Sequence, residues 1–157
     1  MKKIAQILLL VLILIPTSKV LACTCIGTNE SLSKKVNKAY VESDLIFTGK
    51  VISKEIKTNG KYQSSADPVI YKFEIIKKIK GEISVSVIEV VSERDEQSCG
   101  YMFEVGKSYL VYSAESTHFT STTKTKSDFV TGLCRRNQKL NKTRKRELRK
   151  LNRLANK

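Results

Sequence analysis

The sequence has no tryptophan, two prolines and a single histidine, His118, among its 157 residues. It has no G-x-S-x-G motif, no H-E-x-x-H motif and no glycine-rich loop of the kind that cradles phosphates. His118 stands in a run of serine and threonine, so we interpret it as a surface or strand-edge imidazole. The acidic cluster Glu93, Asp95 and Glu96 lacks the spacing of an EF-hand and is interpreted as a solvated loop. We therefore expect neither an enzyme nor a cofactor.

The first 22 residues follow the pattern of a secretory signal peptide. Two lysines precede an apolar run from Ile4 to Ile15, which is short for a membrane span, and Val20-Leu21-Ala22 forms a small-residue exit. Cleavage after Ala22 would make Cys23 the first residue of a secreted or periplasmic protein. Residues 20–23 also pass as a degenerate lipoprotein box, although Leu21 fits it poorly. In that alternative the protein would be lipid-anchored through Cys23.

All four cysteines (Cys23, Cys25, Cys99 and Cys134) follow the signal-like segment. An even number of cysteines in an oxidising compartment predicts disulfides. A bridge between Cys23 and Cys25 would be badly strained, which leaves two pairings that both tie the N-terminal C-x-C to distant parts of the chain. Such long loops should stabilise the fold by about 4 kcal/mol each. A four-thiolate zinc site is the alternative, although structural zinc sites usually pair their ligands as C-x2-C.

Residues 23–134 are expected to form one mainly β domain. A short helix is predicted from an N-cap at Asn29 to Tyr40, with Leu32, Val36 and Ala39 on the same face as Tyr40. The residues at 117–127 are predicted as a weak strand or a loop. Strands are predicted at Asp44–Ile56 with a bulge at Gly49, Pro68–Lys80, Val85–Val91, around Tyr109–Tyr112, and Asp128–Cys134. Short strands without intervening helices favour an antiparallel sandwich or small barrel.

Residues 135–157 form a basic tail. They hold eleven of the 29 lysines and arginines, so the formal net charge of +14 belongs mainly to this tail and the body is nearly neutral. Leu148, Leu151 and Ala155 fall on one helical face and could dock on the body, although a solvated helix or frayed end is the simpler interpretation. The segment Arg135–Lys157 could bind an anionic surface such as glycan or acidic lipid. Almost no aromatic residue accompanies these charges, so we expect no nucleic acid as partner.

Several short motifs in order resemble the N-terminal, inhibitory domain of the tissue inhibitors of metalloproteinases, a netrin-like module with an OB-type barrel. They begin with the C-x-C at the predicted cleavage point and end with a Cys-Gly-Tyr sequence. The motifs are Cys23-Thr24-Cys25, Ser43-Asp44-Leu45-Ile46, Gly49-Lys50-Val51, Tyr71-Lys72-Phe73-Glu74-Ile75, Ile79-Lys80-Gly81 and Glu96-Gln97-Ser98-Cys99-Gly100-Tyr101. Together they cover most of residues 23–134.

The resemblance implies a monomeric inhibitor that acts on a zinc metalloproteinase. It implies disulfides Cys23–Cys99 and Cys25–Cys134, and chelation of the protease zinc by the α-amino nitrogen and carbonyl oxygen of Cys23. Thr24 would enter the specificity pocket, and the isolated inhibitor would bind no metal. The remaining contact ridge would consist of Cys25, Ile26, Glu96, Gln97, Ser98 and Cys99. The alternative is a netrin-like binding module or lipoprotein without inhibitory activity. Family members usually carry a third disulfide, for which four cysteines leave no room.

Overall fold

The computed structural model describes residues 23–156 except residues 26, 28, 59, 65 and 66. The predicted signal peptide, residues 1–22, and the predicted ridge residue Ile26 lie outside the described residues. Signal cleavage and the alternative of lipidation therefore stay predictions.

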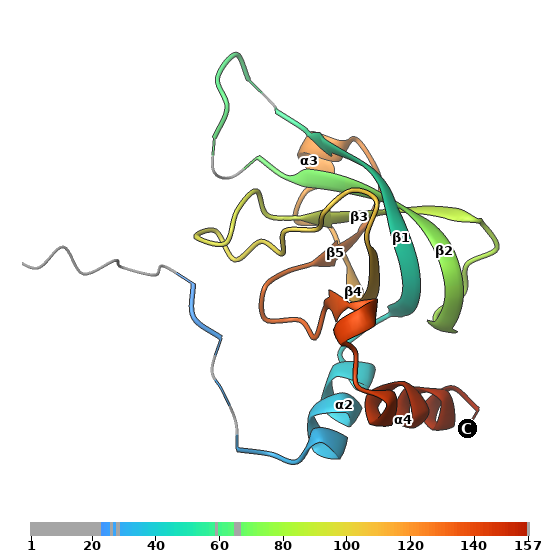
Figure 1. Cartoon of the computed structure of the whole chain (residues 1–157). Helices are drawn as coiled ribbons and strands as arrows, with labels where there is room; N and C mark the ends of the chain where they lie inside the picture. The colour runs from blue at the N-terminus through green and yellow to red at the C-terminus, as the bar shows by residue number, and fades with distance from the viewer. Residues whose placement is uncertain (1–22, 26, 28, 59, 65–66, 157) are drawn as a thin grey trace, which may run out of the picture.

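Five strands close into an OB-fold-like barrel (Figure 1). Neighbouring strands follow the order β1-β2-β3-β5-β4, and pairing of β4 with β1 closes the ring. The prediction of an all-antiparallel sheet was wrong at one place, because β3 and β5 pair in parallel through Val91 with Val130 and Ser92 with Thr131. The strands are β1 (Leu45–Ile56), β2 (Val69–Lys80), β3 (Val87–Ser92), β4 (Ser108–Ser116) and β5 (Asp128–Thr131), with a short β6 (Gln138–Lys139) added to β4.

The barrel interior is filled by the alternate apolar residues of each strand. Phe47, Phe73 and Phe103 meet edge to face, with ring centroids 5.4 Å apart for Phe47–Phe73 and 5.0 Å apart for Phe73–Phe103. The pairing register of β1 with β2 shifts between Thr48 and Gly49, which confirms the predicted bulge. A Cβ at Gly49 would lie 2.9 Å from the carbonyl oxygen of Glu74, so only glycine lets the two strands approach here.

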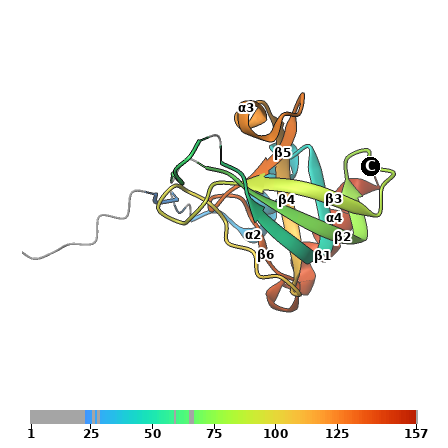
Figure 2. The same cartoon turned by 90° about the horizontal axis from the view of Figure 1, so that it is seen from above.

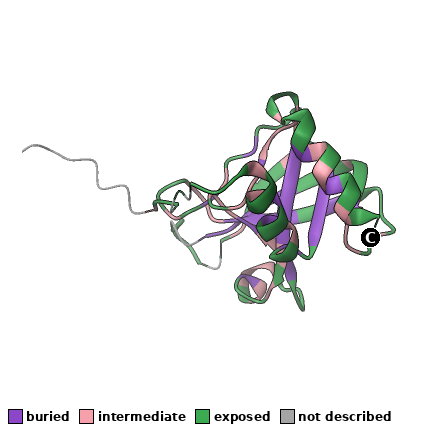
Figure 3. Cartoon of the chain, turned by 90° about the horizontal axis from the view of Figure 1, so that it is seen from below, coloured by how far each residue is buried: buried purple, intermediate pink, exposed green. Residues whose placement is uncertain are grey.

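Two helices cover the outer face of the same strands. In Figure 3 the helices α2 (Leu32–Val41) and α4 (Lys145–Ala155) lie over buried strand segments. The cluster beneath them joins Ile46 of β1 with Leu110 and Tyr112 of β4. Because β1 and β4 have cores on both faces, each contains a continuous run of large apolar residues, 45–47 in β1 and 109–112 in β4.

The structure corrects the predicted boundaries of the first helix. Its N-cap is Ser31 and not Asn29, because the Ser31 side chain accepts a hydrogen bond from the Lys34 amide at 3.4 Å. The predicted inward face is confirmed, since Val36 and Ala39 are buried and Leu32 and Tyr40 pack against the same cluster.

Residues 117–127 form neither a strand nor only a loop. They contain a short helix, α3 (Thr120–Thr123), in which the Thr123 hydroxyl donates to the carbonyl of Phe119 at 3.1 Å and to the carboxylate of Asp128 at 2.8 Å. Phe119 is buried, and it anchors the turn against β2 and β3. Threonine has a low helix propensity, so a helix at these residues is not predictable from their composition.

The basic tail is an integral part of the fold. After β6 and a 3-10 turn, η1 (Leu140–Lys142), the helix α4 buries Leu151 completely and packs Leu148 and Leu154 against α2. The prediction of a docked apolar stripe is confirmed for Leu148 and Leu151. It was wrong for Ala155, which is exposed and whose place Leu154 takes. The interpretation as a solvated or frayed end was also wrong.

Candidate functional site

A short N-terminal segment, Cys23–Cys25, lies at one end of the barrel. A disulfide joins Cys23 to Cys99 with the Cα atoms 5.3 Å apart, and another joins Cys25 to Cys134 with the Cα atoms 5.2 Å apart. These are the two pairings that the family resemblance implies. None of the four sulfurs is free, which excludes the alternative of a four-thiolate zinc site. Thr24 is therefore held between two covalent anchors.

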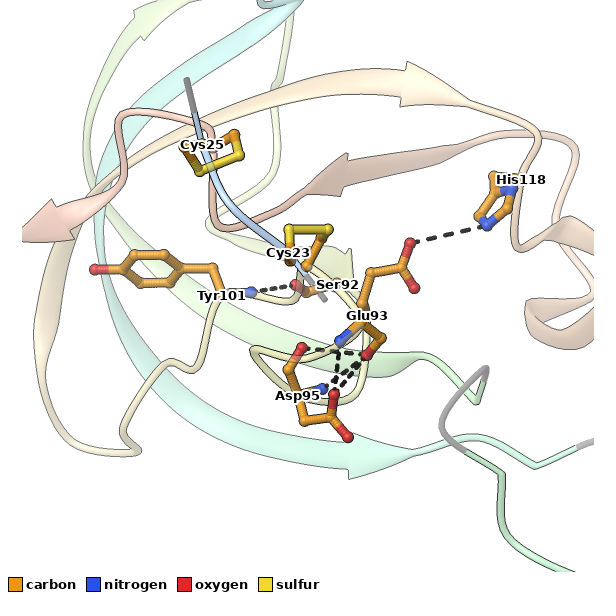
Figure 4. Close-up of a disulfide and its surroundings, with 10 residues drawn as sticks. Cys23, Cys25, Ser92, Glu93, Asp95, Tyr101 and His118 are labelled. Atoms are coloured by element: carbon orange, nitrogen blue, oxygen red, sulfur yellow. Dashed lines mark hydrogen bonds and ion pairs between the residues drawn. A yellow bond between two sulfur atoms is a disulfide. The ribbon is translucent and has the colours of Figure 1, made fainter. Parts of the chain in front are cut away.

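The loop that carries Cys99 is fixed by its own hydrogen bonds. The Ser98 amide donates to the Asp95 carboxylate at 2.9 Å, and the Gly100 amide donates to the Asp95 carbonyl at 2.7 Å. Bonds from the Ser98 hydroxyl and amide hold the pKa of Asp95 below its ordinary value. At the end of the loop the Tyr101 amide donates to the buried Ser92 hydroxyl at 2.9 Å (Figure 4). Residues 93–100 thus form a rigid loop held by hydrogen bonds, although they contain no helix or strand.

The two segments that anchor the N-terminus also bind one another. The Leu133 amide donates to the Cys99 carbonyl at 2.7 Å, and a Cβ at Gly132 would lie 2.9 Å from that same oxygen. Cys99 itself has φ 72°, a left-handed conformation that non-glycine residues rarely adopt. The turn at Gly132 and the loop at Cys99 therefore make one support, which receives Cys23 and Cys25 side by side.

This support presents a row of exposed residues. Thr24 and Cys25 are exposed on the N-terminal segment, and Glu96, Gln97 and Cys99 are exposed on the loop, whereas Cys23 and Ser98 are half-buried. Figure 2 shows the N-terminal segment and the β3–β4 loop together at the end of the barrel. We call Cys23–Cys25 with Glu96–Cys99 the N-terminal edge. The structure brings together all the described residues that the resemblance implies for the contact ridge.

The Glu93 carboxylate, which the sequence pattern predicts to be solvated, lies partly enclosed near this edge. Only 26% of the Glu93 side chain is exposed, and its carboxylate lies 3.9 Å from Nε2 of His118. Burial raises the pKa of Glu93, an effect that the charge of His118 partly offsets. In Figure 4 the Glu93 carboxylate points toward His118, on the side of the loop away from the Asp95 carboxylate. His118 is exposed and packs against Phe119, as predicted for a surface imidazole.

A groove of about 500 Å³ runs beside the edge, between the two disulfides and the ends of β4 and β5. Glu93, Cys99 and Cys134 line it together with Arg135 and the exposed Glu115. Among the described residues, no group of three or more histidine, cysteine, aspartate or glutamate side chains could hold a metal ion. The groove offers a shaped surface of mixed character next to the N-terminal segment, with Glu42, Glu93, Glu115 and Arg135 as its charged residues.

Comparison with known proteins does not assign this chain to a family. No family model matches the chain, and no curated protein matches it. The molecule is a small disulfide-bonded, five-strand β-barrel domain with an OB-like fold. Its two disulfides are typical of an oxidising, extracytoplasmic compartment. No helix in the described part of the chain is both long and apolar enough to cross a bilayer.

Proposed function

We propose that this protein is a secreted inhibitor of zinc metalloproteinases. In this proposal, removal of residues 1–22 frees the α-amino group of Cys23, and that nitrogen and the Cys23 carbonyl oxygen chelate the zinc of the protease. The observation that carries the proposal is the pair of disulfides on either side of the exposed Thr24. They hold the first residues of the mature chain at the surface in one conformation.

The chemistry of a catalytic zinc explains why such a terminus would inhibit. A catalytic zinc has three protein ligands and keeps an open position for water or substrate. An amine and a carbonyl oxygen of one residue can occupy that position together and displace the water that acts as nucleophile. Because the disulfides order the segment before binding, its association loses less conformational entropy than that of a free peptide.

The rest of the N-terminal edge would contact the protease beside its metal. Thr24 is exposed next to the chelating residue and would enter the specificity pocket. Glu96 and Gln97 are exposed on the rigid loop that Cys99 joins to Cys23, and they would extend the contact surface on the other side. Ile26 is proposed to continue the ridge from the N-terminal segment. The half-buried Ser98 supports the loop through Asp95.

The direct test adds one alanine before Cys23 in the mature protein. The added residue converts the amine into an amide, which is a poor zinc ligand, so we expect inhibition of a panel of zinc metalloproteinases to fall at least about 100-fold. The matched control adds one alanine after Lys157, and it should inhibit like the parent. An extended protein with unchanged inhibition constants would refute chelation through Cys23.

Intact mass and N-terminal sequencing of the secreted protein come first. The proposal requires Cys23 as the first residue, with an unmodified amine and all four cysteines oxidised. Acylation of Cys23 would block the amine, and it would establish the alternative of a lipoprotein. Parent protein with the free amine that inhibits no member of the panel would leave the netrin-like binding module, which the charge of helix α4 favours.

A further inference from the structure

The outer face of α4 is a stripe of positive charge. Arg146, Arg149, Lys150 and Arg153 follow the spacing i, i+3, i+4, i+7, which places them on one side of a helix. The inward side of the same helix is occupied by Leu148, Leu151 and Leu154. The packing of the leucines therefore forces the four cations outward, over a length of about 10 Å.

This stripe borders a groove between α4 and α2. The groove has a volume of about 560 Å³, and α2 supplies its other wall with Ser31, Leu32, Ser33 and Val36. The four basic residues of the stripe line it, and no acidic residue does. None of these four basic side chains has a salt bridge among the described residues. The groove thus has a small apolar floor, two hydroxyls and uncompensated positive charge.

Two further depressions lie next to this groove. The next one, of about 380 Å³, shares Leu32 with it and contains Lys142 and Arg144. The third, of about 370 Å³, shares Lys142 with the second and adds Lys107. Two acidic side chains near this path are paired, because Arg136 binds Glu147 at 2.8 Å and Lys139 binds Glu104 at 2.6 Å. Glu30 also lines the second depression, where Lys35, Lys142 and Arg144 outnumber it. Together the three depressions form a basic track along α4 and η1.

We infer that the basic track binds a linear polyanion that carries phosphate groups and no bases. Three of the four cations on the stripe are arginines, whose guanidinium forks pair with phosphate oxygens in a bidentate manner. A series of neighbouring depressions suits an extended chain better than a flat surface does. The basic track would therefore serve as an attachment site, and most of it lies in residues 135–157, which carry most of the net charge.

Two other anionic partners fit the track less well. None of the exposed large apolar side chains of the described chain belongs to α4, so this face has nothing to insert into a bilayer. No aromatic residue lines any of the three depressions, so bases would find no stacking surface. Both classes serve as competing outcomes in the test.

The α4 stripe lies away from the N-terminal edge. Figures 1 and 2 both show α4 at a distance from the segment Cys23–Cys25. A polyanion on the α4 stripe would therefore leave Thr24 and the 93–100 loop accessible. The inference goes beyond the proposed inhibition and does not depend on it.

The experiment measures binding of long-chain inorganic polyphosphate to the full mature protein at several salt concentrations. The triple variant Arg146→Gln, Arg149→Gln, Arg153→Gln should bind about 10-fold more weakly or worse, and its affinity should depend less steeply on salt. The control variant Lys50→Gln, Lys54→Gln, Lys126→Gln removes the same charge from exposed positions outside the track. It should keep most of the affinity. Circular dichroism and thermal unfolding should show that both variants fold like the parent.

Several results would overturn the inference. Equal losses in the two triple variants would mean that only net charge matters. Tighter binding to heparin, single-stranded DNA or phosphatidylglycerol vesicles than to polyphosphate would assign the track to sulfated glycan, nucleic acid or membrane. Absence of binding by the folded parent protein at low salt would remove the site altogether. The triple variant at α4 should still inhibit proteases if the parent does, which separates this test from that of the N-terminal edge.

Discussion

Glu93 differs from Asp95 of the same loop because burial raises the pKa of its carboxyl. The carboxylate lies between the loop and His118, and 26% of the side chain is exposed. Burial raises its pKa above the ordinary value of 4.5, and a protonated His118 offsets part of this rise. A carboxyl whose pKa is higher in the folded than in the unfolded chain lowers stability as pH rises from the unfolded value through the folded value.

We predict that Glu93→Gln raises the melting temperature at pH 8 and has no such effect near pH 4. The amide has nearly the same shape but carries no charge that burial would penalise. Below the ordinary pKa the parent carboxyl is protonated in both states, so the advantage of the variant vanishes there. Thermal unfolding followed by circular dichroism at both pH values measures the effect. Glu96→Gln, at an exposed position of the same loop, should leave the melting temperature unchanged. A variant less stable than the parent at pH 8 would contradict this account.

Gly100 shows what a sequence motif reveals and what it leaves hidden. The Cys-Gly-Tyr motif contributes to the family resemblance, but the motif alone does not explain why its second residue is glycine. The explanation is a close contact across the loop. A Cβ at this position would lie 2.2 Å from the carbonyl oxygen of Glu93 and 2.8 Å from that of Asp95. No side chain fits there. Neither the approach of Glu93 nor its pairing with His118 could be predicted, because residues 93 and 118 meet only through the folding of β4 and α3.

Helix α4 is attached to the barrel by an ion pair as well as by leucines. Two nitrogens of the Arg136 guanidinium donate to the Glu147 carboxylate, Nε at 3.1 Å and one terminal nitrogen at 2.8 Å. The hydroxyl of Tyr112 donates to the same carboxylate at 2.8 Å. Glu147 is 1% exposed, so these partners offset the cost of burying its carboxylate. The network joins the start of the tail, the first turn of α4 and the strand β4.

We predict that Arg136→Ala destabilises the fold by about 3 kcal/mol at pH 7, because it leaves a buried carboxylate with one remaining partner. Urea unfolding at pH 7 measures this. The matched control is Lys38→Ala, which removes the exposed pair with Glu42 at 4.0 Å and should change stability by less than about 0.5 kcal/mol.

The double variant Arg136→Leu, Glu147→Leu tests the same network without leaving a charge unpaired. It should be more stable than Arg136→Ala, because both charges leave the interior together. If the double variant were the less stable one, the ion pair would contribute net stability beyond compensating its own burial. If Arg136→Ala cost nothing, the network would not hold α4.

Strand elements could be predicted from alternation, and their pairing could not. The pattern Val69, Tyr71, Phe73 identified β2 and its inward face, and the run before Gly49 identified β1 and its bulge. The parallel contact of β3 with β5 depends on a crossover through β4 and α3, which local periodicity does not encode. The tail illustrates the same limit. Its leucines predicted a docked helix, but the burial of Glu147 needs Arg136 and Tyr112, which no spacing rule connects.

At the scale of the molecule, the disulfides tie the segment Cys23–Cys25 to two distant parts of the chain. They join cysteines 76 and 109 residues apart, and both reach the support made by the loop at Cys99 and the turn at Gly132. The cysteine count and strain argument from the sequence left two pairings open. Only the resemblance distinguished them, and the structure has the pairing that it implied. The position of that support at an exposed end of the barrel became visible in the structure alone.

The final prediction concerns the bridge that does not involve the chelating residue. Cys25→Ser, Cys134→Ser should lower the free energy of unfolding by about 4 kcal/mol, because the unfolded chain regains the freedom of a long loop. Both cysteines are exposed, so serine leaves no cavity, and the loss reports the cross-link itself. In the proposed function the same variant keeps the Cys23 amine but lets Cys25 move. Inhibition should therefore weaken about 10-fold without disappearing, because the segment must be ordered on binding.

Urea unfolding and inhibition constants, measured at a temperature where parent and variant are both folded, separate the two effects. Unchanged stability would show that the bridge contributes nothing to the free energy of unfolding, which the barrel core would then supply. Unchanged inhibition together with the expected loss of stability would show that the Cys23–Cys99 bridge alone orders the terminus. Complete loss of inhibition in the folded variant would instead show that chelation by Cys23 requires the Cys25–Cys134 bridge.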